Sequence, residues 1–86
     1  MRNYTLTPQF LRDFQILEPT LSPEDIVVFE ALLATIIADP QGVRRVQSFY
    51  DPSQPSWLTR SGPFVAHYAY HVDTDEVVFL NIFRRS

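Results

Sequence analysis

The sequence has no cysteine, no lysine and only two glycines among its 86 residues. Because cysteine is missing, the chain has no disulfide framework, no thiolate zinc site and no cysteine nucleophile, and nothing points to an oxidising compartment. Two glycines are too few for a glycine-rich phosphate-binding loop or for a nucleophile elbow. We therefore expect a cytoplasmic protein without a cofactor.

Long hydrophobic runs are missing as well. The longest apolar stretch, residues 26–38, is interrupted by Glu30 and Thr35, and it is too short to cross about 30 Å of hydrocarbon. The first residues are polar and alternating, unlike a targeting segment, so no membrane contact is expected. The length allows one small domain, residues 1–86. Its seven phenylalanines, four tyrosines and one tryptophan must supply much of the core.

The missing lysine makes the distribution of arginine informative. All seven basic residues are arginines, and the net charge is −3. Residues 1–42 hold two arginines against six acidic residues, whereas residues 43–86 hold five against four. The overall charge argues against non-specific nucleic-acid binding, which draws its affinity from many cations. A local arginine site for carboxylate or phosphate stays open, and so does a simple preference for arginine codons.

Two helices are predicted in the first half of the chain. Thr7 is followed by a proline and by apolar residues at helical spacing, which predicts a helix over residues 8–17. Ser22 is followed by a proline and two acidic residues, which predicts the start of a second helix over residues 23–38. Its apolar face is predicted to contain Ile26, Phe29, Leu33, Ile36 and Ile37.

The second half changes from a helical to an alternating pattern. Residues 64–72 alternate strictly, and residues 76–83 are almost wholly apolar, as in a central strand. The three residues between them predict a turn, so the two strands form an antiparallel hairpin. Residues 56–60 predict a short strand after a proline-rich loop, while residues 43–50 are ambiguous.

These elements predict the fold class. Residues 2–6 also alternate and predict an opening strand. The order is then β-α-α-β-β, with one further strand optional, which is an α+β domain. We expect a helical hairpin over about residues 8–38 to pack on one face of a small antiparallel sheet, formed mainly by residues 43–84.

Four segments carry a resemblance to a known family. They are residues 4–10 (YTLTPQF), 38–40 (ADP), 57–62 (WLTRSG) and 70–85 (YHVDTDEVVFLNIFRR). In this order they look like the RelE/ParE superfamily of toxins from bacterial type II toxin–antitoxin systems. Taken in that order, the first segment resembles the family's first strand and the start of its first helix, and the second resembles the end of its second helix. The third resembles the strand and turn before the central strand, and the fourth resembles the terminal hairpin with its basic end. The resemblance covers essentially the whole chain and implies the RelE-like fold.

The resemblance implies a toxin that binds a cognate antitoxin. In the ribosome-dependent nucleases of this family, basic and aromatic residues on the sheet hold messenger RNA and assist attack of a ribose 2′-hydroxyl on the adjacent phosphate, without a metal. The alignment places His67 where active nucleases carry a strand arginine, and Arg84 or Arg85 at their terminal basic position. The family's lysine-rich surface is absent here. Other members poison DNA gyrase without cutting anything, and some are inactive.

Three residues form the predicted catalytic group. His67 is a candidate for proton transfer or phosphate contact, because imidazole titrates near neutrality; the alternative is a partly exposed strand histidine held by a neighbour. Arg60, close after Trp57, is a candidate phosphate ligand; the alternative is a solvated edge arginine, or one that is paired with an acid such as Asp73. Arg84 is also a candidate phosphate ligand, and its alternative is to belong to a solubilising chain end.

Four further residues are predicted to bind RNA or an acidic antitoxin: Arg44, Arg45, Trp57 and Arg85. Tyr68 and Tyr70 share a face with Phe64, so they are predicted to pack in the core. No metal site is predicted, because His67 and His71 are about 13 Å apart along one strand at about 3.3 Å per residue.

Two functions therefore stay open. The first is a toxin that cleaves messenger RNA on the ribosome, with the antitoxin, the ribosome and messenger RNA as partners and a toxin–antitoxin hetero-oligomer as its resting form. The second is a non-catalytic binding module of the same fold, either an inactive relative or a toxin directed at gyrase, that binds an antitoxin.

Overall fold

The computed structural model of the chain describes residues 2–42, 44–48, 51 and 53–85. The elements follow in the order β1 (Asn3–Leu6), α1 (Pro8–Leu17), a 3-10 turn η1 (Glu18–Thr20), α2 (Pro23–Ala38), β2 (Val46–Ser48), β3 (Ser56–Ser61), β4 (Phe64–His71) and β5 (Glu76–Arg84). Both predicted helices are confirmed at the expected residues. The ambiguous segment contains β2, while Val43, Phe49 and Tyr50 lie outside the described residues.

The helix starts form as their capping residues predict. The Thr7 hydroxyl accepts a hydrogen bond from the backbone N–H of Phe10. At α2, Ser22 and Asp25 form a reciprocal capping box: each side chain accepts from the other residue's backbone N–H, both at 3.1 Å. Each helix also begins with a proline, whose missing N–H costs nothing in the first turn. Local chemistry therefore fixes both starting points.

The strands form one mixed sheet in the order β1-β5-β4-β3-β2. All neighbours are antiparallel except β1 and β5, which are parallel. The expected antiparallel sheet is therefore a mixed one, and the described residues form four strands after the helices rather than two or three. The parallel pair is formed by the first and last strands of the chain, so α1 and α2 belong to the long connection that such pairing requires. The α+β class is confirmed.

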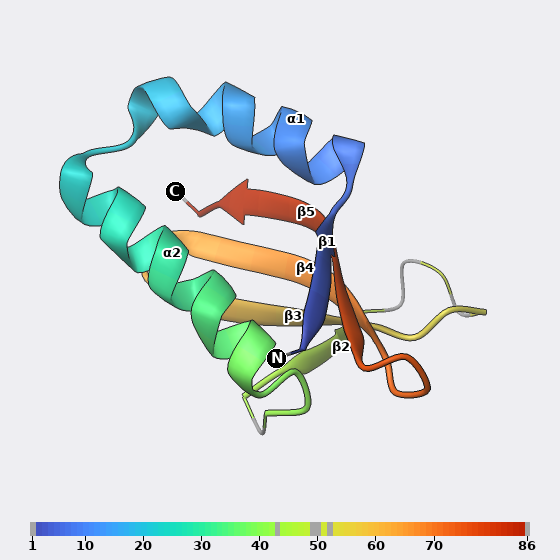
Figure 1. Cartoon of the computed structure of the whole chain (residues 1–86). Coiled ribbons are helices and arrows are strands. Elements are labelled where there is room, and N and C mark those ends of the chain that lie inside the picture. Colours follow the sequence, from blue (N-terminus) through green and yellow to red (C-terminus); the bar gives the residue numbers. More distant parts are fainter. Residues whose placement is uncertain (1, 43, 49–50, 52, 86) are drawn as a thin grey trace.

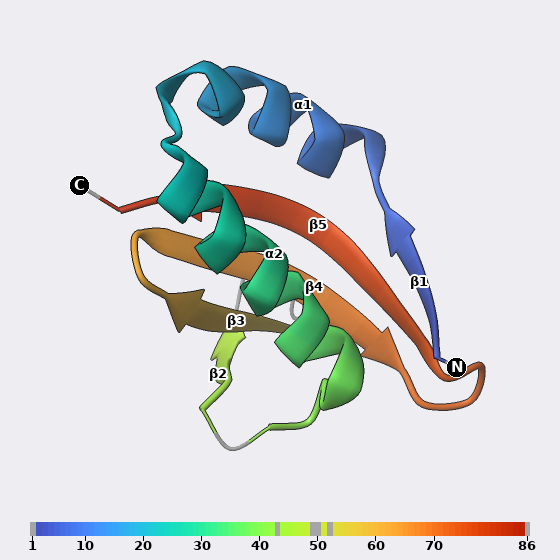
Figure 2. The same ribbon diagram turned by 60° about the vertical axis from the view of Figure 1, so that its left-hand side comes forward.

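Both helices lie on one face of this sheet, with α1 along β5 and α2 crossing β4 and β3 (Figures 1 and 2). We call this the helix-covered face and the opposite side the open face. Phe64, Ala66 and Tyr68 of β4 point toward the helices and are buried to 1% exposure or less. Because neighbouring residues alternate between faces, Val65 and His67 point to the open face.

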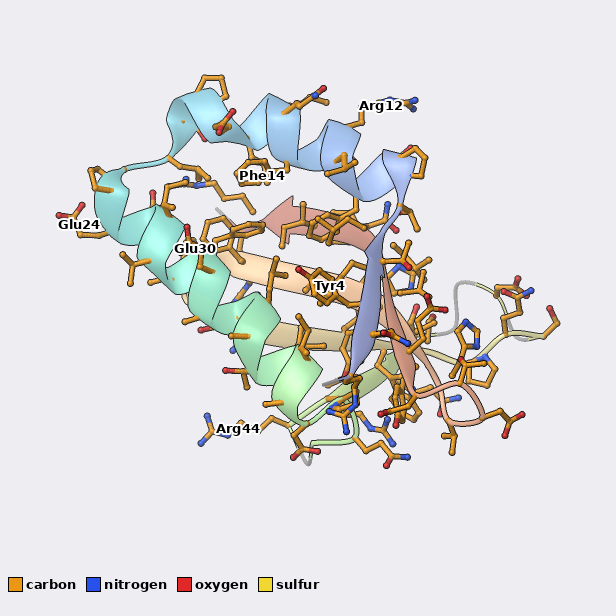
Figure 3. All side chains as sticks on the ribbon, in the orientation of Figure 1. Tyr4, Arg12, Phe14, Glu24, Glu30 and Arg44 are labelled. Atoms are coloured by element: carbon orange, nitrogen blue, oxygen red, sulfur yellow. The ribbon has the colours of Figure 1, made fainter. Side chains whose placement is uncertain are left out.

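The core beneath the helices is aromatic. Phe29 of α2 stacks on Phe14 of α1 with 4.7 Å between ring centroids, and its ring edge meets Phe64 of β4 at 5.7 Å. In Figure 3, Phe14 lies on the inner side of α1. Tyr68 is confirmed as a core residue. The predicted face of α2 omitted Leu32, which is 2% exposed in the core.

One ion pair joins the ends of three elements. Arg2 donates from Nε to Asp75 Oδ1 at 2.7 Å, and its Nη1 donates to the carbonyls of Ile37 and Ala38 at the end of α2. The hydroxyl of Tyr70 donates to the same Asp75 oxygen at 2.7 Å. The hydrogen bond from Arg2, followed by that from Tyr70, holds the pKa of Asp75 below its ordinary value. The β4–β5 turn is thereby tied to the beginning of β1 and the end of α2.

This ion pair predicts part of the acid sensitivity of the fold. A carboxyl group whose pKa is lower in the folded state than in the unfolded state stabilises the fold fully when the pH is above its unfolded-state pKa of about 3.9. This stabilisation is lost as the pH falls through the folded-state pKa. We expect Asp75→Asn to be less stable than the parent at pH 7, with the difference shrinking toward pH 2. Urea unfolding at a series of pH values measures it. Asp73→Asn in the same exposed turn is the control, and a difference independent of pH would contradict the assignment.

Candidate functional site

Three arginines gather at the end of α2 and the neighbouring part of β3. Arg44, Arg45 and Arg60 line one cavity of about 360 Å³ between these elements. Arg44 and Arg60 also line an adjoining cavity of about 520 Å³ with Val46, Leu58 and others. We call these three residues the arginine edge, because Arg60 belongs to β3 and the other two directly precede the edge strand β2. The structure thus brings together three of the five arginines from the second half of the chain.

One member of the arginine edge, Arg45, contacts an aromatic ring and a backbone carbonyl oxygen. The guanidinium carbon of Arg45 lies 3.6 Å from the ring centroid of Trp57, a close cation–π contact. Arg45 also donates to the carbonyl oxygen of Pro40 at 3.3 Å, and the buried hydroxyl of Tyr68 donates to that oxygen at 2.8 Å. Burial raises the pKa of Tyr68, so its hydroxyl remains a donor at neutral pH. Arg45 is therefore held in place, whereas the side chains of Arg44 and Arg60 are exposed.

His67 differs from its predicted state. The alternative to a catalytic role was a partly exposed histidine, but the side chain is buried, with 4% of its surface exposed. Its Nδ1 lies 2.9 Å from Asn81 Oδ1 and its Nε2 lies 2.8 Å from Ser56 Oγ. The burial follows from the sheet order, which puts β4 in the centre with β3 and β5 on either side. These contacts agree with the alternative interpretation, a histidine held by its neighbours, and the catalytic role of His67 stays a prediction.

Arg60 and His67 lie on the same face of the sheet. In the register, Arg60 is opposite Val65, and Leu58 is opposite His67. Residues that pair across strands share a face, and diagonal neighbours such as Arg60 and His67 are about 7 to 8 Å apart at the backbone. The open face therefore carries both an exposed guanidinium and a buried imidazole at neighbouring positions.

Arg84 lies elsewhere. It is opposite Phe64 in the register, which places it on the helix-covered face. Its Nη1 donates to Asp25 Oδ2 at 3.3 Å. The pKa of Asp25 is lowered, mainly by the backbone hydrogen bond from Ser22 and further by Arg84. The predicted trio of Arg60, His67 and Arg84 is therefore wrong as a single cluster, because Arg84 points to the opposite face from the other two.

Arg85 follows at the end of the last strand. Its backbone N–H donates to the carbonyl of Pro63 in the β3–β4 turn, and its side chain is exposed. It remains a predicted binding residue that contributes to neither arginine-edge cavity.

Some polar residues of the site were missed at the sequence level. Ser56 and Asn81, the partners of His67, come from β3 and β5. A usable signal was present for Asn81, which interrupts the apolar run 77–83 and so requires a partner when buried. Within the described ranges, no group of three or more histidine, acidic or cysteine residues is arranged to hold a metal ion. Within the same ranges no helix is both long and apolar enough to cross a membrane.

Comparison with known proteins identifies the fold. No family model and no curated protein matches the sequence. The structure matches a chain in the crystal structure of the toxin–antitoxin complex RelBE2 from Mycobacterium tuberculosis, with a TM-score of 0.73 and 18% sequence identity. The match covers 98% of both chains. The chain therefore has the RelE-like fold that the sequence resemblance implied.

Proposed function

We propose that this protein is the toxin of a toxin–antitoxin pair and that it inhibits translation by cleaving messenger RNA on the ribosome. The observation that carries the proposal is the arginine edge on a RelE-like fold: Arg44, Arg45 and Arg60 gathered at the β2–β3 side of the sheet. Arginine suits this role because its planar guanidinium binds phosphate oxygens in pairs. The Trp57 ring beneath Arg45 adds a flat surface beside the cations.

The same edge fits an antitoxin. An acidic segment of an antitoxin would pair with Arg44, Arg45 and Arg60 and so occupy the RNA site, which explains how binding would silence the toxin. Among the described residues, β2 is the outer strand on this side of the sheet and lies next to these side chains, so an antitoxin strand would add there. We expect a hetero-oligomer of toxin and antitoxin in the bacterial cytoplasm.

In the cleavage reaction, the arginines and His67 have separate tasks. Arg60, with Arg44, binds the scissile phosphate and stabilises the charge that develops on it. His67 accepts a proton from the 2′-hydroxyl as its oxygen bonds to phosphorus, while the P–O5′ bond breaks and the leaving 5′-oxygen takes a proton from water. The diagonal placement of Arg60 and His67 on the open face supports this assignment.

Expression without an antitoxin tests the proposal. We expect growth arrest with the parent chain, relief of arrest with Arg60→Ala or His67→Ala, and no relief with Arg12→Ala on α1. Mapping of RNA ends after induction should show cuts within translated messages that disappear in the two relieved variants. A parent chain that is not toxic when stably expressed would contradict the proposal.

A second function has specific support. Arg84 is paired with Asp25 on the helix-covered face, and His67 is buried with both ring nitrogens in contact with other side chains. Both features favour a non-catalytic module that binds an antitoxin or poisons a target such as gyrase. Growth arrest with intact RNA, together with co-purification of gyrase, would identify this alternative.

A further inference from the structure

Four polar side chains form a continuous series of hydrogen bonds that runs from the open face of the sheet to α1. Ser56 Oγ lies 2.8 Å from His67 Nε2, and His67 Nδ1 lies 2.9 Å from Asn81 Oδ1. Asn81 Nδ2 then donates to Asp13 Oδ2 at 3.3 Å. The four residues come from β3, β4, β5 and α1. A hydroxyl, an imidazole and an orienting group in this order are the parts of an activated nucleophile.

The hydrogen bonds around Asn81 place a proton on Nδ1 of the His67 imidazole. Because the carboxylate of Asp13 accepts hydrogen bonds, the amide of Asn81 must point its NH₂ group at Asp13 and its oxygen at His67. That oxygen only accepts, so the ring proton lies on Nδ1. When the ring is neutral, Nε2 carries a lone pair to which the Ser56 hydroxyl can donate. This is the tautomer in which histidine can take the serine proton.

Asp13 is itself anchored. Its Oδ2 accepts the backbone N–H of Ile82 at 3.3 Å, beyond the point where β1 stops pairing with β5. Its Oδ1 accepts from the side-chain amide of Gln9 at 2.7 Å. The orientation of the Asn81 amide is therefore set by a carboxylate that is bonded to both a helix side chain and a strand backbone.

The pairing of β4 with β5 shifts by one residue beside His67. His67 pairs with Asn81 and Tyr68 pairs with Phe79, so Leu80 is an extra residue in β5. The Thr7 hydroxyl donates to the carbonyl of Phe79 at 2.8 Å and stabilises the irregular segment. Bulges re-aim side chains and are frequent beside active sites. Here the bulge allows Asn81 to face His67 while Phe79 remains in the core.

Three of the four hydrogen-bonded side chains line a cavity. Ser56, His67 and Asn81 all line a cavity of about 440 Å³ on the open face, and the serine and histidine are each 4% exposed. The rest of the lining is mostly uncharged, contributed by the start of α1, the loop before β3 and the neighbouring parts of β4 and β5: Thr7, Pro8, Gln9, Gln54, Pro55, Ala69, Val78 and Leu80. The acidic Asp51 and the imidazole of His71 complete the lining. Such a cavity suits a small neutral acyl group.

We propose that Ser56 is a nucleophile toward small uncharged acyl esters, with His67 as its base and Asn81 as the positioning residue. Ser56 Oγ forms a bond to the acyl carbon while its proton moves to His67 Nε2. The ester C–O bond breaks, and the leaving alkoxide takes that proton. Water then attacks the acyl-serine, gives its proton to Nε2 and releases the acid, and the proton returns to Ser56. This site shares His67 with the proposed RNA-cleavage site but contains none of the three arginines of the arginine edge.

The test uses the purified full chain and a fluorophosphonate probe, which reacts with activated serines. We expect one adduct, located on Ser56 by tandem mass spectrometry, and slow hydrolysis of p-nitrophenyl butyrate that the adduct blocks. Ser56→Ala should abolish both. Ser61→Ala, at the other end of β3 and on the helix-covered face, should retain both. No adduct on Ser56 of the parent chain would overturn the proposal.

Asn81 is tested by loss and rescue. We expect Asn81→Ala to slow labelling of Ser56 at least about 10-fold, as removal of an orienting group does. The exchange Asp13→Asn with Asn81→Asp keeps an acceptor on Nδ1 and reverses the polarity of the next bond, so it should restore labelling. Equal labelling in the parent and Asn81→Ala, or no rescue in a folded exchange variant, would show that the four side chains are purely structural. Both readouts are independent of RNA cleavage and growth arrest.

Discussion

Replacing Phe29 with alanine should lower the free energy of unfolding by about 3–5 kcal/mol, the usual loss for a buried phenylalanine. Phe29 is 7% exposed and stacks on both Phe10 and Phe14, with 6.2 and 4.7 Å between ring centroids. It also meets Phe64 edge to face at 5.7 Å. One side chain therefore joins α1, α2 and β4, and its removal leaves a cavity between all three.

Urea unfolding followed by circular dichroism measures this loss as a lower transition midpoint with an unchanged slope. Val27→Ala on the same helix is the control, because Val27 is 66% exposed and its replacement should change the unfolding free energy by less than about 0.5 kcal/mol. Phe29→Leu should fall between the two. A Phe29→Ala midpoint equal to that of Val27→Ala would mean that the aromatic cluster does not hold the helices on the sheet.

The helices were predictable because their signals are local. Thr7 and Ser22 cap the helices that follow them through bonds three residues away. Asn81 was also detectable in principle, as a polar residue inside an apolar strand. Such signals depend on short separations along the chain, so the sequence alone contains them.

The arrangement of the site was less predictable because it depends on strand pairing. Arg84 and Arg85 are adjacent in sequence, and a shift of one residue in register exchanges the faces of the sheet that they point to. Only the pairing of Phe64 with Arg84 places Arg84 under the helices, where Asp25 binds it. The burial of His67 likewise required the central position of β4, which no local pattern fixes.

Replacing Arg44 and Arg60 together with glutamine should remove most of the affinity for single-stranded RNA. On the proposed function, each arginine neutralises one phosphate, and a charged hydrogen bond contributes about 1.5–3 kcal/mol. We therefore expect affinity at low salt to fall at least about 100-fold. The variant should also fail to arrest growth. Since neither side chain is buried, the loss should occur with little change in the unfolding midpoint.

Salt dependence separates lost phosphate contacts from a general change in charge. Each phosphate contact to a single strand contributes about 0.7 to the slope of log affinity against log salt, so the double variant should reduce the slope by about 1.4. Arg12→Gln is the control, since Arg12 lies on α1, far from Arg44 (Figure 3). For each positive charge removed, Arg12→Gln should change the salt slope much less than the double variant does. If Arg12→Gln lowered affinity and slope by half as much as the double variant, overall charge rather than the arginine edge would govern binding, and the RNA site would have to lie elsewhere.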